Sequence, residues 1–180
     1  MTDEVKTGLP PIAPPDARLF ILGSLPGDAS LAAARYYAHP QNQFWRLVGS
    51  VIGEDLHALP YPERLGCLAA HRIGLWDVIG SAIRRGSLDQ AIRLANHNRI
   101  EQLIHDFPDL EAIAFNGATS ATAGRKQIGT VHRVTLIDLP SSSPANTRPF
   151  AEKADAWARL RPFCDAASCT VGQTRRNVTG

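Results

Sequence analysis

Two segments of small and polar residues each follow an apolar run, and they lie far apart in the sequence. The first occupies residues 23–28 and the second occupies residues 139–146. In an open α/β sheet, the loops that follow the strands carry the ligand-binding residues. Hydroxyls and amides in such loops orient water and bind phosphates or the edges of bases. We therefore expect the residues of these segments to position water, phosphates or bases by hydrogen bonds.

Asn42 lies after the first of these segments, and its side chain has two alternative uses. An amide is not a base, but it can hold a water molecule and direct its carbonyl dipole at a developing cation. Asn42 also directly precedes an amphipathic helical pattern, where Asn is a favoured N-cap residue. The residue types alone favour the capping role. The two uses need different orientations of one side chain, so they compete.

Strands and helices are predicted to alternate along the chain. We expect strands over residues 18–22, 73–79, 112–115 and 131–139, and helices over residues 30–37, 42–52, 62–72, 100–107 and 150–163. Short, mostly apolar strands of this kind predict a parallel sheet covered on both faces. The expected fold is therefore α/β, a three-layer α/β/α single domain with a central, mainly parallel four-stranded sheet. Gly23 and Leu139 should lie at the carboxyl edge of neighbouring strands.

The chain of 180 residues has the length of one domain. Residues 1–16 are rich in proline and are expected to form a flexible arm, residues 17–163 the folded domain, and residues 164–180 a disordered tail. Residues 80–89 are expected to form a polar loop. No apolar stretch is long enough to span a bilayer, and the N-terminus lacks an apolar signal region. We therefore expect a cytoplasmic protein.

Charge and cysteine content restrict the function only weakly. A net charge of +2 is a weak indication of a polyanionic partner. The basic clusters Arg84-Arg85, Arg125-Lys126 and Arg148 are either DNA-facing or simply solvated. The three cysteines are odd in number and include no Cys-x-x-Cys pair, so neither a disulfide framework nor a four-cysteine metal site is expected. Cys67 is expected to be a small core residue of a helix.

The two polar segments together resemble the two motifs of the uracil-DNA glycosylase superfamily, and within it the hypoxanthine-DNA (deoxyinosine) glycosylase branch. The first motif continues into residues 37–45, which read Tyr-Ala-His-Pro-Gln-Asn-Gln-Phe-Trp. The second motif reads Leu-Pro-Ser-Ser-Ser-Pro-Ala-Asn over residues 139–146. The resemblance extends over about residues 18–163. It implies hydrolysis of the N-glycosidic bond of a flipped, deaminated base without metal or cofactor.

The resemblance also implies roles for residues of the first motif. Asn42 would orient the hydrolytic water, which raises the catalytic interpretation to equal standing with the helix cap. Tyr37 would stack on the flipped base. Leu25 stands where related branches carry Asp or Asn, a departure from the uracil-excising pattern that the hypoxanthine branch shares. The predicted base pocket consists of Gly23, Ser24, Leu25, Pro26, Gly27, Tyr37 and Asn116. Asn116 is alternatively part of an Asn-Gly turn.

In the second motif, serines stand in place of the histidine of the uracil-specific enzymes. The resemblance makes this segment a loop that presses into the DNA duplex, although a Ser-rich turn before proline is the alternative reading. The predicted DNA contacts are Ser141, Ser142, Ser143, Pro144, Asn146 and Arg148. His39 is expected to make structural hydrogen bonds. Asp77 is either a pocket carboxylate or a loop cap.

These observations together predict a monofunctional DNA glycosylase that removes hypoxanthine from deoxyinosine and leaves an abasic site. The expected partner is DNA containing deaminated bases, with no membrane, metal or cofactor, and the protein is expected to be a monomer. The alternatives are a uracil- or xanthine-directed enzyme of the same superfamily and a non-catalytic nucleic-acid-binding module. A serine hydrolase using Ser24 or Ser30 would need a histidine base oriented by an acid.

Overall fold

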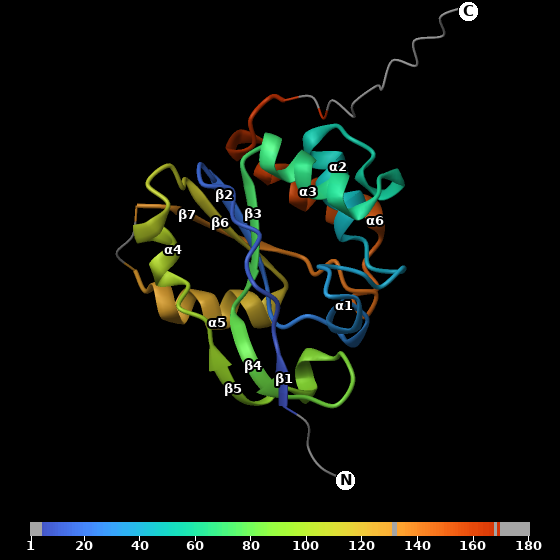
Figure 1. Ribbon diagram of the computed structural model, residues 1–180, viewed down its shortest axis with the longest axis vertical. Helices are drawn as coiled ribbons and strands as arrows, with labels where there is room; N and C mark the ends of the chain where they lie inside the picture. The colour runs from blue at the N-terminus through green and yellow to red at the C-terminus, as the bar shows by residue number, and fades with distance from the viewer. Residues whose placement is uncertain (1–4, 131–132, 168, 170–180) are drawn as a thin grey trace, which may run out of the picture.

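The computed structural model describes residues 5–130, 133–167 and 169, and its centre is a four-stranded sheet (Figure 1). The strands are β2 (Leu19–Gly23), β3 (Ile73–Asp77), β6 (Ala112–Asn116) and β7 (Thr135–Leu139). Their order is β3-β2-β6-β7, and all three pairings are parallel. The prediction of a central parallel sheet is confirmed. The near-continuous apolar run of β2 is typical of a strand buried on both faces.

Helices cover both faces of this sheet and complete three layers (Figure 1). One face carries α2 (Phe44–Ile52), α3 (Tyr61–Ala70) and α6 (Phe150–Trp157); the other carries α4 (Glu101–Asp106) and α5 (Ala118–Ile128). Successive side chains of a strand point to opposite faces. Leu19 and Ile21 therefore pack with Trp157 in one core, whereas Phe20 and Leu22 pack with residues of α4 and α5 in the other.

A second, antiparallel sheet was not predicted. It consists of β1 (Val5–Thr7), β4 (Ile79–Ile83) and β5 (Arg93–His97), in the order β1-β4-β5. Val5 pairs with Ile83, and Ile12 forms a bridge with Leu75 of the main sheet. The prediction of a flexible arm is therefore wrong for residues 5–16, because the backbone of this segment pairs with distant strands. The prediction of a loop over residues 80–89 is likewise wrong at its start, because strand β4 extends to Ile83.

Helix α5 was not predicted from the sequence. The remaining helices are short. They are α1 (Asp28–Ala33), η1 (Leu56–Ala58), η2 (Asp89–Ala91) and η3 (Ala158–Phe163). The helix expected from Asn42 begins at Phe44 and ends before Gly53, whose φ is +78°. Among the described residues, no helix has the length and apolar character needed to cross a membrane.

The start of the predicted disordered tail is packed against the domain. Asp165 forms ion pairs with Arg18 and Arg72, and Cys169 forms a disulfide with Cys67 of α3. The expectation that the cysteines form no disulfide is therefore wrong, since residues 102 positions apart meet only in the folded chain. The other residues beyond 167 lie outside the described part of the chain.

Candidate active site

The two sequence motifs meet at the carboxyl edge of the central sheet. Gly23 ends β2, Leu139 ends β7, and Asn116 ends the strand β6 that lies between them. The strands of Gly23 and Leu139 are therefore not neighbours, which corrects one detail of the predicted topology. The loops that follow are nevertheless in contact, because the backbone N–H of Gln43 donates a 3.0 Å hydrogen bond to the carbonyl of Ser142.

Asn116 is the residue that connects the two motifs. Its Nδ2 donates to Ser142 Oγ at 2.8 Å and to the Tyr37 hydroxyl at 3.3 Å, while its Oδ1 accepts from the Ser142 backbone N–H at 2.8 Å. The side chain is 8% exposed. Asn116 therefore lies at the predicted pocket, but its amide is occupied by protein groups. Gly117 follows with a φ of +102° and begins α5, so Asn-Gly is a strand-to-helix junction here.

Tyr37 is half-buried beside this amide, and its ring is fixed in place. One face of the ring stacks on Phe44, with centroids 3.7 Å apart and an interplanar angle of 6°. Its backbone has a φ of +52°, which is uncommon for a bulky residue. Burial, followed by the nearby Asp77, raises the pKa of the Tyr37 phenol, so the hydroxyl is neutral and remains a hydrogen-bond donor.

Asn42 lies one residue before the N-cap of α2. Its Oδ1 accepts a 3.0 Å hydrogen bond from the backbone N–H of Phe44, the first residue of that helix. Asn42 is therefore not the N-cap residue that the capping interpretation predicted, but its side chain supports the first turn of the helix from one position earlier. A carbonyl oxygen has two lone pairs, so this bond leaves one for a water molecule. Nearby, His39 Nδ1 accepts from the Gln41 N–H, the structural role expected for that histidine.

The first-motif loop is held from beneath by a buried arginine. Arg84 is 2% exposed, and its guanidinium donates to the carbonyls of Leu25 and Pro26. Leu25 is buried against Ile79 and Ala82 of the small sheet. Leu25 and Pro26 are both buried, and their place in the base pocket stays a prediction, whereas the buried Arg84 is not a DNA-facing charge. The half-exposed Gly27 leads into α1.

At the carboxyl edge of the sheet, the side chain of Asp77 lies close against the backbone of Gly23. A Cβ atom on Gly23 would overlap Asp77 Oδ1 and lie 3.2 Å from the Tyr37 hydroxyl oxygen. Glycine is therefore required where these two side chains converge. Asp77 is buried, and its Oδ2 has no hydrogen-bond partner among the described residues. Burial is the main cause that raises the pKa of Asp77 to about 7, opposed by Arg84.

The second-motif loop is internally bonded. Ser142 has no exposed surface, so the prediction that it contacts DNA is contradicted; its hydroxyl accepts from Asn116 instead. Ser141 and Ser143 are half-buried and accept backbone N–H bonds within the loop. Asn146 is also half-buried: its Nδ2 donates to the Ser141 carbonyl, and its Oδ1 accepts from the N–H of Arg148.

Lys153 of α6 joins the two motifs a second time. Although it is only 1% exposed, its ammonium group donates to Gln43 Oε1 at 3.0 Å and to the Asn146 carbonyl at 2.7 Å. Burial lowers the pKa of this lysine. No sequence pattern predicted this role, because Lys153 lies within a helix and belongs to neither motif.

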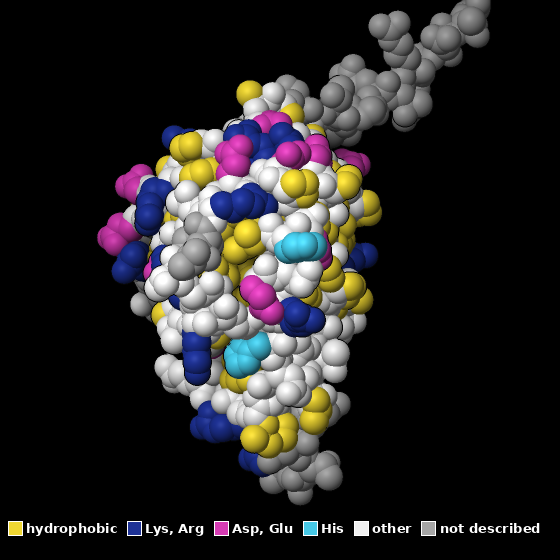
Figure 2. All heavy atoms as spheres, turned by 90° about the vertical axis from the view of Figure 1, so that its left-hand side faces the viewer, with side chains coloured by type: hydrophobic (Ala, Val, Ile, Leu, Met, Phe, Trp, Pro, Cys, Tyr) yellow, Lys and Arg dark blue, Asp and Glu magenta, His cyan; other side chains and the backbone are white. Residues whose placement is uncertain are grey.

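The exposed part of the second loop is small. Pro144 and Arg148 lie on its outer surface, and Arg148 Nε is 4.0 Å from Glu152 Oε2. Of the other basic clusters, Arg125 pairs with Asp138 at 2.9 Å. Figure 2 shows acidic and basic side chains intermixed on the side of the molecule that carries α4 and α5. Arg148 is thus the member of the predicted basic clusters that lies on a motif loop with an exposed side chain.

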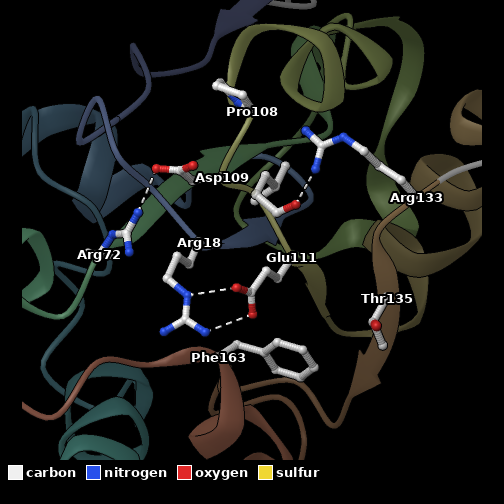
Figure 3. Close-up of a pocket in the computed structure, with 9 residues that line it drawn as sticks. Arg18, Arg72, Pro108, Asp109, Glu111, Arg133, Thr135 and Phe163 are labelled. Atoms are coloured by element: carbon white, nitrogen blue, oxygen red, sulfur yellow. Dashed lines mark hydrogen bonds and ion pairs between the residues drawn. The ribbon is translucent and has the colours of Figure 1, made fainter.

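A cavity of about 620 Å³ lies at the opposite, amino edge of the sheet (Figure 3). Arg18 precedes β2 and pairs with Glu111, which precedes β6, and Arg72 pairs with Asp109. Arg133 donates to the carbonyl of Leu110. Ligands of open α/β sheets bind at the carboxyl edge. Arg18 and Arg72 are paired with carboxylates and Arg133 is bonded to a backbone carbonyl, which indicates a structural role.

The serine hydrolase alternative finds no support at this edge. The Ser24 hydroxyl donates to Asp89 at 2.7 Å, and the buried Ser30 hydroxyl accepts from the N–H of Ala38. Neither is hydrogen-bonded to a histidine within the described residues, so the base that such an enzyme needs is not in place.

Comparisons with known proteins agree with this geometry. Residues 10–161 match the family model of the uracil DNA glycosylase superfamily. Hypoxanthine DNA glycosylase of Methanosarcina barkeri (strain Fusaro / DSM 804) is 39% identical over 155 residues, covering 85% of this chain and 96% of that protein. The protein of the same name from Methanosarcina acetivorans is 38% identical over 153 residues, with the same coverage.

A solved structure gives the same result for the fold. The solution NMR structure of a Methanosarcina acetivorans protein assigned as a uracil DNA glycosylase aligns with a TM-score of 0.78 at 36% identity, covering 89% of this chain and 99% of that one. The family match includes both motif loops and the strands that carry them. The chain therefore belongs to the uracil DNA glycosylase superfamily.

Proposed function

We propose that this DNA glycosylase removes hypoxanthine from deoxyinosine in DNA and leaves an abasic site. The observation that carries the proposal is the joining of both motif loops by Asn116, which binds Ser142 of one and Tyr37 of the other. The two relatives at 38% and 39% identity, both named hypoxanthine DNA glycosylase, support the choice of base. The substrate class is thus duplex or single-stranded DNA with a deaminated purine.

Cleavage of the N-glycosidic bond develops positive charge on the sugar and negative charge on the leaving base. In the proposed site, the flipped base stacks on the face of Tyr37 opposite Phe44, a contact worth ~1–3 kcal/mol. Asn42 orients the attacking water through the second lone pair of Oδ1, while the first keeps its bond to the Phe44 N–H. Capping and catalysis then use the same orientation of the side chain and do not compete.

Asp77 supplies the titratable group of the proposed pocket. Its neutral form is a hydrogen-bond donor, and a pKa of about 7 leaves a large neutral fraction at physiological pH. A carboxylic acid held neutral in this way can donate to an anion that develops in the transition state. The Oδ2 atom of Asp77, which has no hydrogen-bond partner among the described residues, is the group that we assign to contact the purine.

The outer surface of the second loop is proposed to contact the DNA backbone. Arg148 would pair with a phosphate, and Pro144 would lie against the distorted strand. Lys153 and Asn116 act indirectly, because they hold the loop that presents these residues. The cytoplasmic location and the monomeric state stay predictions.

The test is a single-turnover excision assay on labelled duplexes that contain deoxyinosine, deoxyxanthosine, deoxyuridine or undamaged deoxyadenosine. We expect deoxyinosine to be processed fastest, with strand breaks only after alkali, as a monofunctional enzyme requires. Fastest release of uracil or xanthine would favour the alternative substrates. Binding of the duplexes without excision of any base would identify a non-catalytic DNA-binding module.

A further inference from the structure

A group of metal-ligating side chains lies beside the end of α3, outside the two motif loops. Glu54 follows α2, His71 follows α3, and Cys169 is joined by its disulfide to Cys67 of α3. One carboxylate oxygen of Glu54, one ring nitrogen of His71 and the Cys169 sulfur all lie within 4.8 Å of one another. None of these residues belongs to the glycosylase motifs.

His71 is arranged as a metal-binding histidine. It is 2% exposed, and its Nδ1 lies 2.7 Å from the Asp165 carbonyl oxygen, to which it therefore donates. The second nitrogen, Nε2, has no hydrogen-bond partner among the described residues, and in the neutral ring with Nδ1 as the donor it is the atom that carries the free lone pair. A buried polar atom without a partner costs ~1–3 kcal/mol. Metal-ligating histidines commonly bind a carbonyl with one nitrogen and the metal with the other.

Cys67 lies next to this group and is a candidate fourth ligand, although the mutually close ligand atoms are those of Glu54, His71 and Cys169. It forms the disulfide with Cys169, so its sulfur adjoins the group. It also lies four residues before His71, whose backbone N–H donates to the Cys67 carbonyl at 3.1 Å, and this spacing places both side chains on one side of the helix end. Glu54 Oε1 accepts from the Cys169 N–H at 3.1 Å, which leaves Oε2 available. Two sulfurs, one imidazole and one carboxylate are zinc ligands.

We propose that Cys67, His71, Cys169 and Glu54 bind a zinc-like divalent cation when the disulfide is reduced. A thiol or phosphine reductant supplies two electrons to the S–S bond and is itself oxidised, and each sulfur takes up one proton. The cation then displaces these two protons and binds both thiolates, His71 Nε2 and the Glu54 carboxylate. The C-terminal segment is thus tied to α3 in either redox state, by a disulfide or by a metal.

The test uses Co²⁺ as the probe, because a cobalt–thiolate bond gives a charge-transfer absorption band. The full-length protein is reduced with a phosphine, stripped of metal and titrated with Co²⁺. We expect one equivalent to bind with this band and with the visible bands of tetrahedral cobalt, and Zn²⁺ to displace it. Protein with the disulfide intact should give neither. Reduced protein with its free thiols verified, yet without a cobalt–thiolate band, would overturn the proposal.

Variants locate the site. Cys169→Ser and Glu54→Gln should each weaken Co²⁺ binding by more than ~10-fold. Cys164→Ser is the matched control, since that cysteine is free and its thiol contacts the Leu160 carbonyl. A band that is lost in Cys164→Ser and retained in Cys169→Ser would also overturn the proposal. Circular dichroism of each variant verifies folding. Thermal unfolding of the reduced protein with Zn²⁺ and with a chelator gives a second readout, independent of excision activity.

Discussion

Asn116 holds Ser142 by two hydrogen bonds of 2.8 Å, one to the hydroxyl and one to the backbone N–H. Ser142 has no exposed surface, so neither of these groups can be satisfied by solvent. The relationship explains how a serine-rich turn acquires one conformation. It also makes the second motif dependent on a residue of a different strand.

Asn116→Ala should therefore reduce both stability and excision. Unpartnered groups at Ser142 cost ~1–3 kcal/mol each, which lowers the melting temperature by several degrees. We expect the single-turnover rate of the folded variant to fall as well, because Tyr37 loses its polar contact. The control is Asn96→Ala, whose exposed side chain binds Ser81 on the small sheet. Equal effects of the two substitutions would contradict the role given to Asn116.

Substitution of Asn42 separates capping from catalysis. Asn42→Ala should lower stability by about 1 kcal/mol and the excision rate by ~100-fold or more. Asn42→Asp keeps an acceptor for the Phe44 N–H, so it should restore the melting temperature. It also places a negative charge near the departing anion, so the rate on deoxyinosine should stay low. A folded Ala variant with the wild-type rate would show that Asn42 only caps the helix.

The pKa of Asp77 predicts a pH dependence of stability. Because the pKa is raised from 3.8 to about 7, the folded state binds a proton that the unfolded state has released. This contribution to the free energy of unfolding is complete below pH ~4 and is lost as the pH rises through about 7, on the order of 4 kcal/mol. Asp77→Asn should flatten the stability curve between these values. The measurement is urea unfolding across that pH range.

The same variant tests the proposed hydrogen bond to the base. If neutral Asp77 donates to hypoxanthine, the excision rate should fall as the pH rises through about 7. The amide of Asn cannot titrate, so Asp77→Asn should remove this limb of the profile. A wild-type profile that is flat around pH 7 would place Asp77 outside the reaction while leaving its effect on stability intact.

Arg148 should control the salt dependence of DNA binding. Its side chain is exposed on the second loop, and each phosphate contact contributes about one unit to the slope of log affinity against log salt. Arg148→Ala should weaken binding to damaged and undamaged duplexes alike and reduce that slope by about one. Arg99→Ala is the control, because Arg99 pairs with Glu101 away from the motif loops. An unchanged slope would exclude Arg148 from the interface.

The sequence predicted those elements whose signal is local. The apolar run of β2 and the periodicity of α2 each identify an element without knowledge of the rest of the chain. Strand β1 is different: its three residues become a strand only by pairing with β4, and their alternation is too short to recognise. The Cys67–Cys169 disulfide also depends on long-range contact.

The motifs predicted which residues lie near the site, but not which way their side chains point. A motif names residues that lie near the reaction, and it does not say which of them turn inward. Ser142 and Leu25 are buried, whereas Ser141 and Ser24 beside them are partly exposed. Arg84 belonged to a basic cluster in the sequence, yet it binds carbonyls beneath the first loop. These differences are decided by packing between strands that are distant in the chain.

The bond between the Gln43 N–H and the Ser142 carbonyl joins the two loops directly, and Lys153 joins them again. Loops connected in this way cannot close separately around a substrate. The conformational change on binding must then occur in the DNA, where the base pair opens so that the damaged nucleotide can enter the site. Opening costs least for a poorly paired base. Excision of hypoxanthine should therefore be faster where the opposite base pairs with it weakly, and fastest in single strands.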